Sequence, residues 1–174
     1  MPVSNHTINT LNDLLNDNAA GFPLAEAALQ KSLDKWILAA QSVKLKSVLQ
    51  KYKDQVVQHI QKMGKYAEEE NINSLQATNR IMNSFIEETE EKLNKCGDAE
   101  TKDACLLACV QAINHYKISM YGTAAAFANA VSLEKYAAVF HEAEINEKQI
   151  DDRLTQLADF EVNLKAKAPI VLPG

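Results

Sequence analysis

The stretch NHYKISMYGTAAAFANAV, Asn114–Val131, is apolar at helical spacing, yet it carries His115 and Lys117 among its apolar residues. Residues three and four apart in sequence fall on one face of a helix. By that spacing Lys117 lies on an apolar stripe that also holds Val110, Ile113, Met120, Tyr121 and Ala124. The stretch therefore predicts a long buried helix, over about residues 101–130, with a charged side chain on its inward face.

The rest of the chain shows the same helical spacing, and no segment alternates as a strand would. We expect a first helix from an N-cap at Thr7, broken or kinked near Pro23, and a second helix after Ser42. Further helices are expected over about residues 74–94 and from an N-cap at Ser132 to about residue 164. The chain is thus predicted to form one all-α domain over residues 1–174. Its architecture would be an antiparallel bundle of four main helices with an additional fifth helix, and an extended tail at residues 165–174.

Composition narrows the classes of function. The net charge is −5 and no basic run is present, so we expect no nucleic-acid partner. No apolar segment approaches the roughly 20 residues that span a bilayer, and the N-terminus lacks the basic flank and apolar core of a signal peptide. We therefore expect a cytoplasmic protein without a membrane partner. Cys96, Cys105 and Cys109 are expected to be reduced thiols, because the CxxC spacing and fourth ligand of a zinc site are missing.

Two segments resemble a known family. The stretches LLACVQAINHYKISMYGTAAAFANAV and LEKYAAVFHEAEINEKQIDDRLTQLA, residues 106–131 and 133–158, resemble the YciE/YciF-type family of bacterial ferritin-like proteins. There, a helix with an EHYE-like segment and YGT precedes the last helix. The segment AAQS, Ala39–Ser42, is the best match in the first half. The resemblance implies a ferritin-like fold related to rubrerythrin and ferritin, an association with stress, and a homodimer.

The resemblance also implies a place for a di-metal centre between the helices. Such centres use about four carboxylates and two histidines, including Glu-x-x-His pairs on two helices. This chain contains no Glu-x-x-His motif. The positions three residues before His59, His115 and His141 hold Val56, Ala112 and Ala138 instead of glutamate. The family's acidic positions fall on Asn114 and Lys117, and one in the third helix falls on or near Asn83, whereas Glu147 keeps its acid. The centre is therefore expected to be largely lost.

The first helix allows two placements of the family's acid. Aligning on AAQS puts that acid on Glu26, which is kept. Aligning instead on LNDLLNDNAAGF, residues 11–22, puts the comparable position near Asn18, where the acid is lost. The two placements stay open at the level of sequence.

The inward charges need partners, because a lone buried ammonium or carboxylate is costly. Glu26 and Glu147 lie on apolar stripes, as Lys117 does. Our hypothesis is that Lys117 pairs with Glu147, Glu26 or both, and that Asn114 satisfies the remaining hydrogen bonds. A fixed cation at this place would replace the charge of metal ions and repel them.

Two alternatives use the same residues differently. The first is a redox or iron- or manganese-handling protein with a modified di-iron or mono-metal centre; its ligands would come from Glu26, His59, His115, His141, Glu144 and Glu147. Within that set, HEAEINE spaces His141, Glu144 and Glu147 for one helix face. The second is a small-molecule pocket in the vacated centre, lined by Glu26, Lys117 and Glu147 with Asn18, Tyr52, Asn83 and Asn114. Because a phosphate loop, a GxSxG elbow and a CxxC motif are all missing, we expect binding or assembly without a cofactor rather than catalysis.

Overall fold

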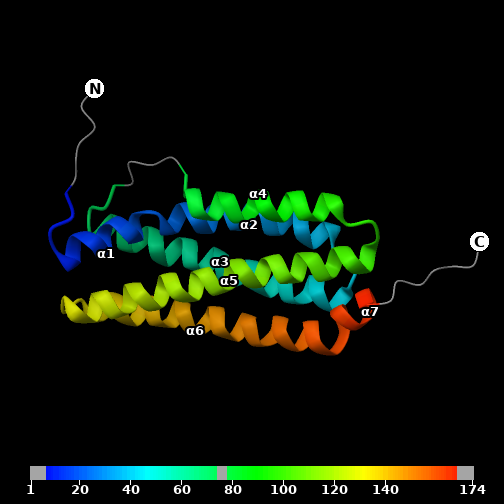
Figure 1. The fold of residues 1–174 in the computed structure, drawn as a ribbon. Helices are drawn as coiled ribbons and strands as arrows, with labels where there is room; N and C mark the ends of the chain where they lie inside the picture. The colour runs from blue at the N-terminus through cyan, green and yellow to red at the C-terminus, as the bar shows by residue number, and fades with distance from the viewer. Residues whose placement is uncertain (1–6, 74–77, 168–174) are drawn as a thin grey trace, which may run out of the picture.

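The structure is a computed structural model that describes residues 7–73 and 78–167. Within those ranges it contains helices and no strand, which confirms the all-α prediction (Figure 1). The elements are α1 Leu11–Ala20, α2 Phe22–Ala39, α3 Val43–Glu69, α4 Arg80–Lys95, α5 Ala99–Ala130, α6 Glu134–Leu157, the π-helical turn η1 Ala158–Val162, and α7 Asn163–Lys167.

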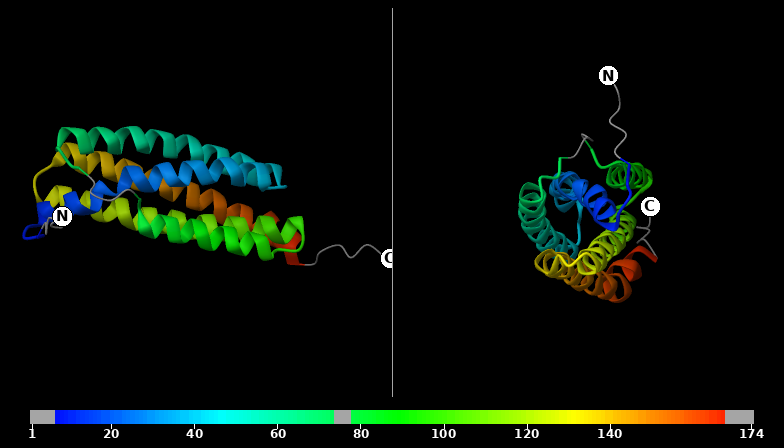
Figure 2. Two further views of the ribbon diagram at one scale, coloured as in Figure 1. Left: turned by 90° about the horizontal axis from the view of Figure 1, so that it is seen from above. Right: turned by 90° about the vertical axis from the view of Figure 1, so that its left-hand side faces the viewer.

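Helices α2, α3, α5 and α6 form a four-helix bundle, and α4 is the additional helix. The antiparallel pairs α2–α3 and α5–α6 pack most extensively, and α3 also packs against α6. After α3 the chain returns along the outside of the bundle as α4, which packs on α2 and α5 (Figures 1 and 2). Because of this single crossover, α5 runs in the same direction as α3. The predicted architecture of four main helices plus a fifth is therefore confirmed.

The first helix is broken at Gly21, as the nearby proline predicts. Helix α1 ends at Ala20 and α2 starts at Phe22, with Pro23 in its first turn, where a missing N–H costs no helical bond. A side chain at Gly21 would meet the amide of Asn79, which donates to the Gly21 carbonyl. The predicted cap at Thr7 is wrong: Thr10 caps α1 in a capping box with Asp13.

The other helix ends agree with the sequence-based predictions in part. Ser42 caps α3 as predicted, by accepting a bond from Leu45 N at 3.2 Å. The predicted cap at Ser132 is wrong, because Ser132 has a left-handed φ of 60° and α6 begins after Leu133 without a side-chain cap. Residues 74–77 of the predicted third helix lie outside the described residues, and α4 begins after the cap residue Asn79. The tail predicted from residue 165 is wrong for residues 165–167, which belong to α7, and residues 168–174 lie outside the described residues.

The buried apolar residues form two clusters, one toward each end of the bundle. The first holds Leu29, Leu49, Val56, Ile113 and Ile150, among others. The second holds Phe22, Met63, Tyr66, Tyr121 and Ala143, among others. Along each bundle helix a buried polar residue stands between the two clusters; these are Glu26, His59, Lys117 and Glu147. The fold therefore builds a polar layer across its middle.

None of the described helices combines the length and the apolar character that crossing a membrane requires.

Asp103 on α5 fixes the connection between α2 and α3. Its buried carboxylate accepts bonds from Gln41 N at 2.9 Å and Ser42 N at 2.7 Å. We predict that Asp103→Ala lowers the free energy of unfolding by about 2–3 kcal/mol, because it leaves two backbone donors unsatisfied. The control Asp98→Ala, which removes the exposed cap of α5, should cost about 1 kcal/mol. Urea unfolding of both variants checks this, and equal losses would contradict the assigned role of Asp103.

Candidate functional site

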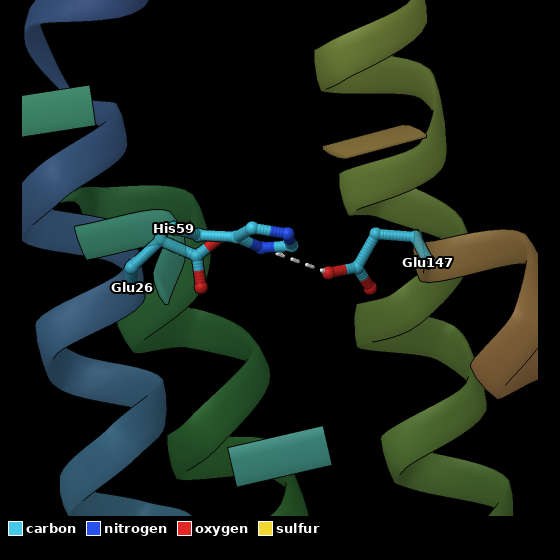
Figure 3. A group of neighbouring side chains, drawn as sticks. All are labelled: Glu26, His59 and Glu147. Carbon is cyan, nitrogen blue, oxygen red and sulfur yellow. Dashed lines mark hydrogen bonds and ion pairs between the residues drawn. The ribbon is translucent and has the colours of Figure 1, made fainter. Parts of the chain in front are cut away.

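Seven fully buried polar side chains meet in the middle of the bundle. We call them the polar cluster: Glu26 from α2, Tyr52 and His59 from α3, Asn114, Lys117 and Tyr121 from α5, and Glu147 from α6. Figure 3 shows Glu26 and His59 reaching from one side of the bundle toward Glu147 on the other. All four bundle helices therefore contribute to one site, and α4 contributes no member of the cluster.

Lys117 lies between the two carboxylates. Its Nζ is 2.5 Å from Glu147 Oε1 and 3.0 Å from Glu26 Oε2. The same ammonium lies 4.7 Å from the centre of the Tyr52 ring, where a cation–π contact adds to its stabilisation. One buried cation thus pairs with two buried anions, and the attraction between opposite charges away from water holds it there.

The carboxylate oxygens have further donors. Tyr52 Oη donates to Glu147 Oε2 at 2.7 Å. Asn114 Nδ2 donates to the same oxygen at 2.7 Å and to the Glu147 backbone carbonyl at 2.9 Å. The hydroxyl of Tyr121 donates to Glu26 Oε1. Buried polar atoms are stable only when they have partners, and these bonds satisfy Glu26 Oε1 and Glu147 Oε2, whereas the other oxygen of each carboxylate faces the Lys117 ammonium.

The His59 ring, like the Lys117 ammonium, lies close to both carboxylates. Its Nδ1 is 3.3 Å from Glu26 Oε1 and 3.5 Å from Glu147 Oε1. Its ring meets the ring of Tyr121 at an edge, with the centroids 5.3 Å apart. With a neutral imidazole the cluster carries two negative charges and one positive charge, and a protonated His59 would balance it.

The charges of the cluster stabilise one another. Burial alone would raise the pKa of Glu26, but the Lys117 ammonium and the bonds from His59 and Tyr121 lower it below its ordinary value of 4.5. Burial alone would lower the pKa of Lys117, and the charges of Glu147 and Glu26 raise it above 10.5 instead. Burial, together with the neighbouring carboxylates, raises the pKa of Tyr52 and Tyr121 well above 10. Lys117 therefore stays an ammonium, and both tyrosines stay hydroxyl donors at neutral pH.

The structure places most of the residues that the sequence singles out. Of the pairings that the sequence leaves open for Lys117, the structure has the one with both Glu26 and Glu147, and Asn114 is bonded to Glu147. Asn18 is exposed, so the alignment that puts Glu26 at the site fits the structure. Asn83 is half-buried on α4, outside the polar cluster. The other side chains predicted to line a vacated pocket instead contact one another; these are Glu26, Tyr52, Asn114, Lys117 and Glu147.

Three residues of the alternative ligand set lie away from the cluster. His115 is exposed and pairs with Asp151 at 2.9 Å. His141 is exposed and lies 3.3 Å from Glu144, which also pairs with Lys148 at 2.6 Å. Glu147 is fully buried, so HEAEINE does not bring His141, Glu144 and Glu147 together as one metal site.

Sequence reasoning gave too little weight to His59 and did not assign Tyr121 to the site. A signal for Tyr121 exists, because Asn114, Lys117 and Tyr121 are spaced i, i+3 and i+7 on one helix face. His59 follows Tyr52 at i+7 in the same way. Neither spacing distinguishes a site residue from a core residue, so only the neighbouring helices identify them.

The cluster does not fit a di-metal centre. The cluster contains two carboxylates and one histidine. A di-metal centre in a helical bundle uses about four carboxylates and two histidines. The oxygen and nitrogen atoms of Glu26, His59 and Glu147 do lie within 4.8 Å of one another. The ammonium of Lys117, however, forms an ion pair with each of those carboxylates. A metal ion would have to displace it.

Removal of the Lys117 ammonium should destabilise the folded protein. We predict that Lys117→Met lowers the free energy of unfolding by about 3–5 kcal/mol, because two buried carboxylates lose their common partner. The control Lys62→Met removes a partly exposed surface lysine that pairs with Glu142 at 2.7 Å, and should cost less than about 1 kcal/mol. Chemical denaturation compares the two, and similar losses would mean that Lys117 does not hold the cluster.

Stability should depend on pH through Glu26. Its pKa is lower in the folded chain than its ordinary 4.5, so the unfolded chain binds the proton first as pH falls. The contribution of Glu26 is thus full above pH 4.5 and is lost as pH falls through the folded value. We predict that Glu26→Gln flattens the dependence of unfolding free energy on pH below about 4.5. Urea titrations at a series of pH values measure it, and an unchanged slope would argue against an ionised Glu26.

A family model, a relative of known sequence and a solved structure all match this chain over most of its length. The family described as "Domain of unknown function (DUF892)" matches residues 10–167. Protein YciF of Escherichia coli strain K12 is 31% identical over 144 residues, which cover 82% of this chain and 87% of that protein. The crystal structure of the E. coli stress protein YciF matches with a TM-score of 0.81 and 28% identity, over 90% of this chain and 99% of that one.

A second solved structure shares the fold. YcfI from Rhodopseudomonas palustris matches with a TM-score of 0.81 and 23% identity, over 87% of this chain and 96% of that one. The family match spans nearly the whole helical region, and the relative in E. coli confirms the resemblance to YciE/YciF-type proteins. The chain therefore belongs to the DUF892 family.

Proposed function

We propose that this chain is a cytoplasmic, stress-associated protein of the ferritin-like type that acts by binding or assembly, as a homodimer. In it, an internal ion-pair network takes the place of a di-metal centre. Two findings support the general assignment: the E. coli relative is described as a stress protein, and the bundle has one crossover connection, as ferritin-like folds do.

The observation that carries the proposal is the position of Lys117 Nζ. It lies within 3.0 Å of a carboxylate oxygen of both Glu26 and Glu147, at the place where those acids would bind a cation. A divalent ion at the same place would meet a positive charge at a few ångströms, where the repulsion in a partly buried site amounts to several kcal/mol. The ammonium therefore competes with any metal ion for the only two carboxylates of the cluster.

The remaining donors support the same proposal. Tyr52 and Asn114 occupy one oxygen of Glu147, and Tyr121 occupies one oxygen of Glu26. Those oxygens would otherwise be free for a metal. The cluster is also fully buried, so a substrate has no direct contact with it. The protein's activity is therefore expected on its surface rather than in its centre.

One observation favours the alternative, a protein that handles iron or manganese. Ligand atoms of Glu26, His59 and Glu147 already lie close enough together to hold one ion. In that case Lys117 would leave the site when the ion enters. The two proposals differ in whether the native chain or only a chain without Lys117 takes up metal.

Metal uptake by the native chain and by Lys117→Ala distinguishes them. We predict that the native chain, incubated with ferrous iron or manganese without oxygen and then desalted, retains far less than one ion per chain. Lys117→Ala should retain up to one, because it uncovers two carboxylates and an imidazole. The matched control Lys62→Ala should behave as the native chain does.

Cobalt(II) gives a second readout that does not depend on yield. In Lys117→Ala, cobalt should develop visible absorption and raise the melting temperature, and Lys117→Ala/His59→Ala should lose both effects. Stoichiometric metal in the native chain would contradict the proposal and favour the alternative.

A further inference from the structure

The most exposed large apolar side chains of the described residues gather at one end of the bundle. They are Leu38, Val43, Phe160 and Leu164, whose exposed fractions are 81%, 80%, 80% and 62%. Leu38 lies at the end of α2 and Val43 at the start of α3, and the other two lie in η1 and α7 at the same end (Figure 1). Single exposed apolar residues are ordinary, whereas several at one place indicate a surface that contacts another molecule.

A groove lies between the start of α3 and the end of α6 at this end of the bundle. Its volume is 470 Å³, and it is lined by Lys44, Val48, Arg153, Gln156, Leu157 and Phe160, among others. Lys44 on one wall pairs with Glu161 on the other at 2.6 Å. Clefts of about 300–1,000 Å³ take up whole small molecules, so this groove has room for one aromatic side chain.

We propose that this end is the contact surface of the homodimer and that a second copy of the chain occupies the groove. The two copies are related by a two-fold axis near Gln156, and Phe160 of each copy enters the groove of the other. The inference rests on the proposed homodimer and assigns the surface that forms it.

Two charged side chains near the groove make this surface complementary to itself. Arg153 and Asp159 are exposed, and within the part of the chain that the structure describes neither takes part in an ion pair or a side-chain hydrogen bond. They stand three residues before and three residues after Gln156. When two copies of this segment meet antiparallel across a two-fold axis at Gln156, each Arg153 faces Asp159 of the other copy. A two-fold interface requires this kind of self-complementarity.

The exposed apolar area also suits a dimer. A stable interface buries roughly 800 Å² on each copy, and more than half of that area is apolar. One aromatic side chain supplies about 150–250 Å² when it is buried completely. Phe160, together with Val43, Leu164 and Leu38, therefore supplies an apolar area of the order that a dimer needs, and the charged residues form its polar rim.

Other occupants would use only part of this surface. A small anion would pair with Arg153, but it would leave Asp159 without a partner. The chain's own residues 168–174, APIVLPG, carry no charged side chain, so they would leave both Arg153 and Asp159 unpaired. Of these occupants, a second copy of the chain supplies a partner for both charges as well as an apolar side chain for the groove.

Sedimentation velocity of the full-length chain tests the apolar contact. We expect the native chain to be a dimer at micromolar concentration and Phe160→Ser to weaken the dimer at least about tenfold, because buried aromatic anchors dominate such interfaces. The control Ile145→Ser removes another exposed apolar side chain, from the middle of α6, and should leave the dimer unchanged. Far-ultraviolet circular dichroism checks that each variant is folded.

Charge reversal tests the two-fold arrangement. Arg153→Asp and Asp159→Arg should each weaken the dimer, because each places two like charges opposite one another. The double variant Arg153→Asp/Asp159→Arg should restore most of the lost affinity, since both pairs are then formed with the signs exchanged. A surface that used only one of the two charges would show no such recovery.

The outcomes separate this surface from the homodimer itself. A native dimer that Phe160→Ser and both charge reversals leave intact would overturn the assigned surface and keep the proposed homodimer. A monomeric native chain would contradict both. A chain that forms dimers only after residues 168–174 are removed would mean that those residues occupy the groove, and it would also overturn the proposal.

Discussion

A lysine ammonium without water contact keeps its charge only where anions surround it, and Lys117 meets that condition between Glu26 and Glu147. The rest of the bundle depends on this contact. Glu26, Lys117 and Glu147 come from three helices, so the ion pairs fix where those helices face one another. They also explain why two apolar clusters, rather than one continuous core, fill the space between the helices. Two buried carboxylates without that cation would have to take up protons or admit water.

Connectivity brings these groups together. Helix α4 carries no member of the polar cluster, yet it returns the chain along the outside of the bundle, so that α5 packs antiparallel to α6 and α6 packs against α3. The members of the cluster are far apart in sequence: Tyr52 and Glu147 are separated by 95 positions, as are Glu26 and Tyr121. Asp103 ties the start of α5 to the connection between α2 and α3. The Asp103 contact and the polar cluster therefore connect α5 to α2 and α3 at two separate positions along the bundle.

Much of this arrangement could be predicted from the sequence, because a charged residue on an apolar stripe signals a buried partner. That signal indicated Lys117, Glu26 and Glu147. It could not rank His59 or Tyr121, since single histidines and tyrosines on a stripe are also ordinary core residues. The choice between Glu26 and Asn18 depended on the break at Gly21, which turns α1 relative to α2. The misplaced caps at Thr7 and Ser132 have a local cause: several residues near a helix end can accept the capping bond, and tertiary packing decides which one does.

The polar cluster also specifies the fold in a way that an apolar core would not. Each carboxylate oxygen has its own partners: Lys117 at one oxygen of each acid, Tyr121 and His59 at the other oxygen of Glu26, and Tyr52 and Asn114 at the other oxygen of Glu147. A shift of one helix by a single turn, about 5.4 Å, would break several of these bonds at once. Apolar side chains tolerate such a shift more easily, because their contacts are not directional. The network therefore fixes the register of the four helices that contribute to it.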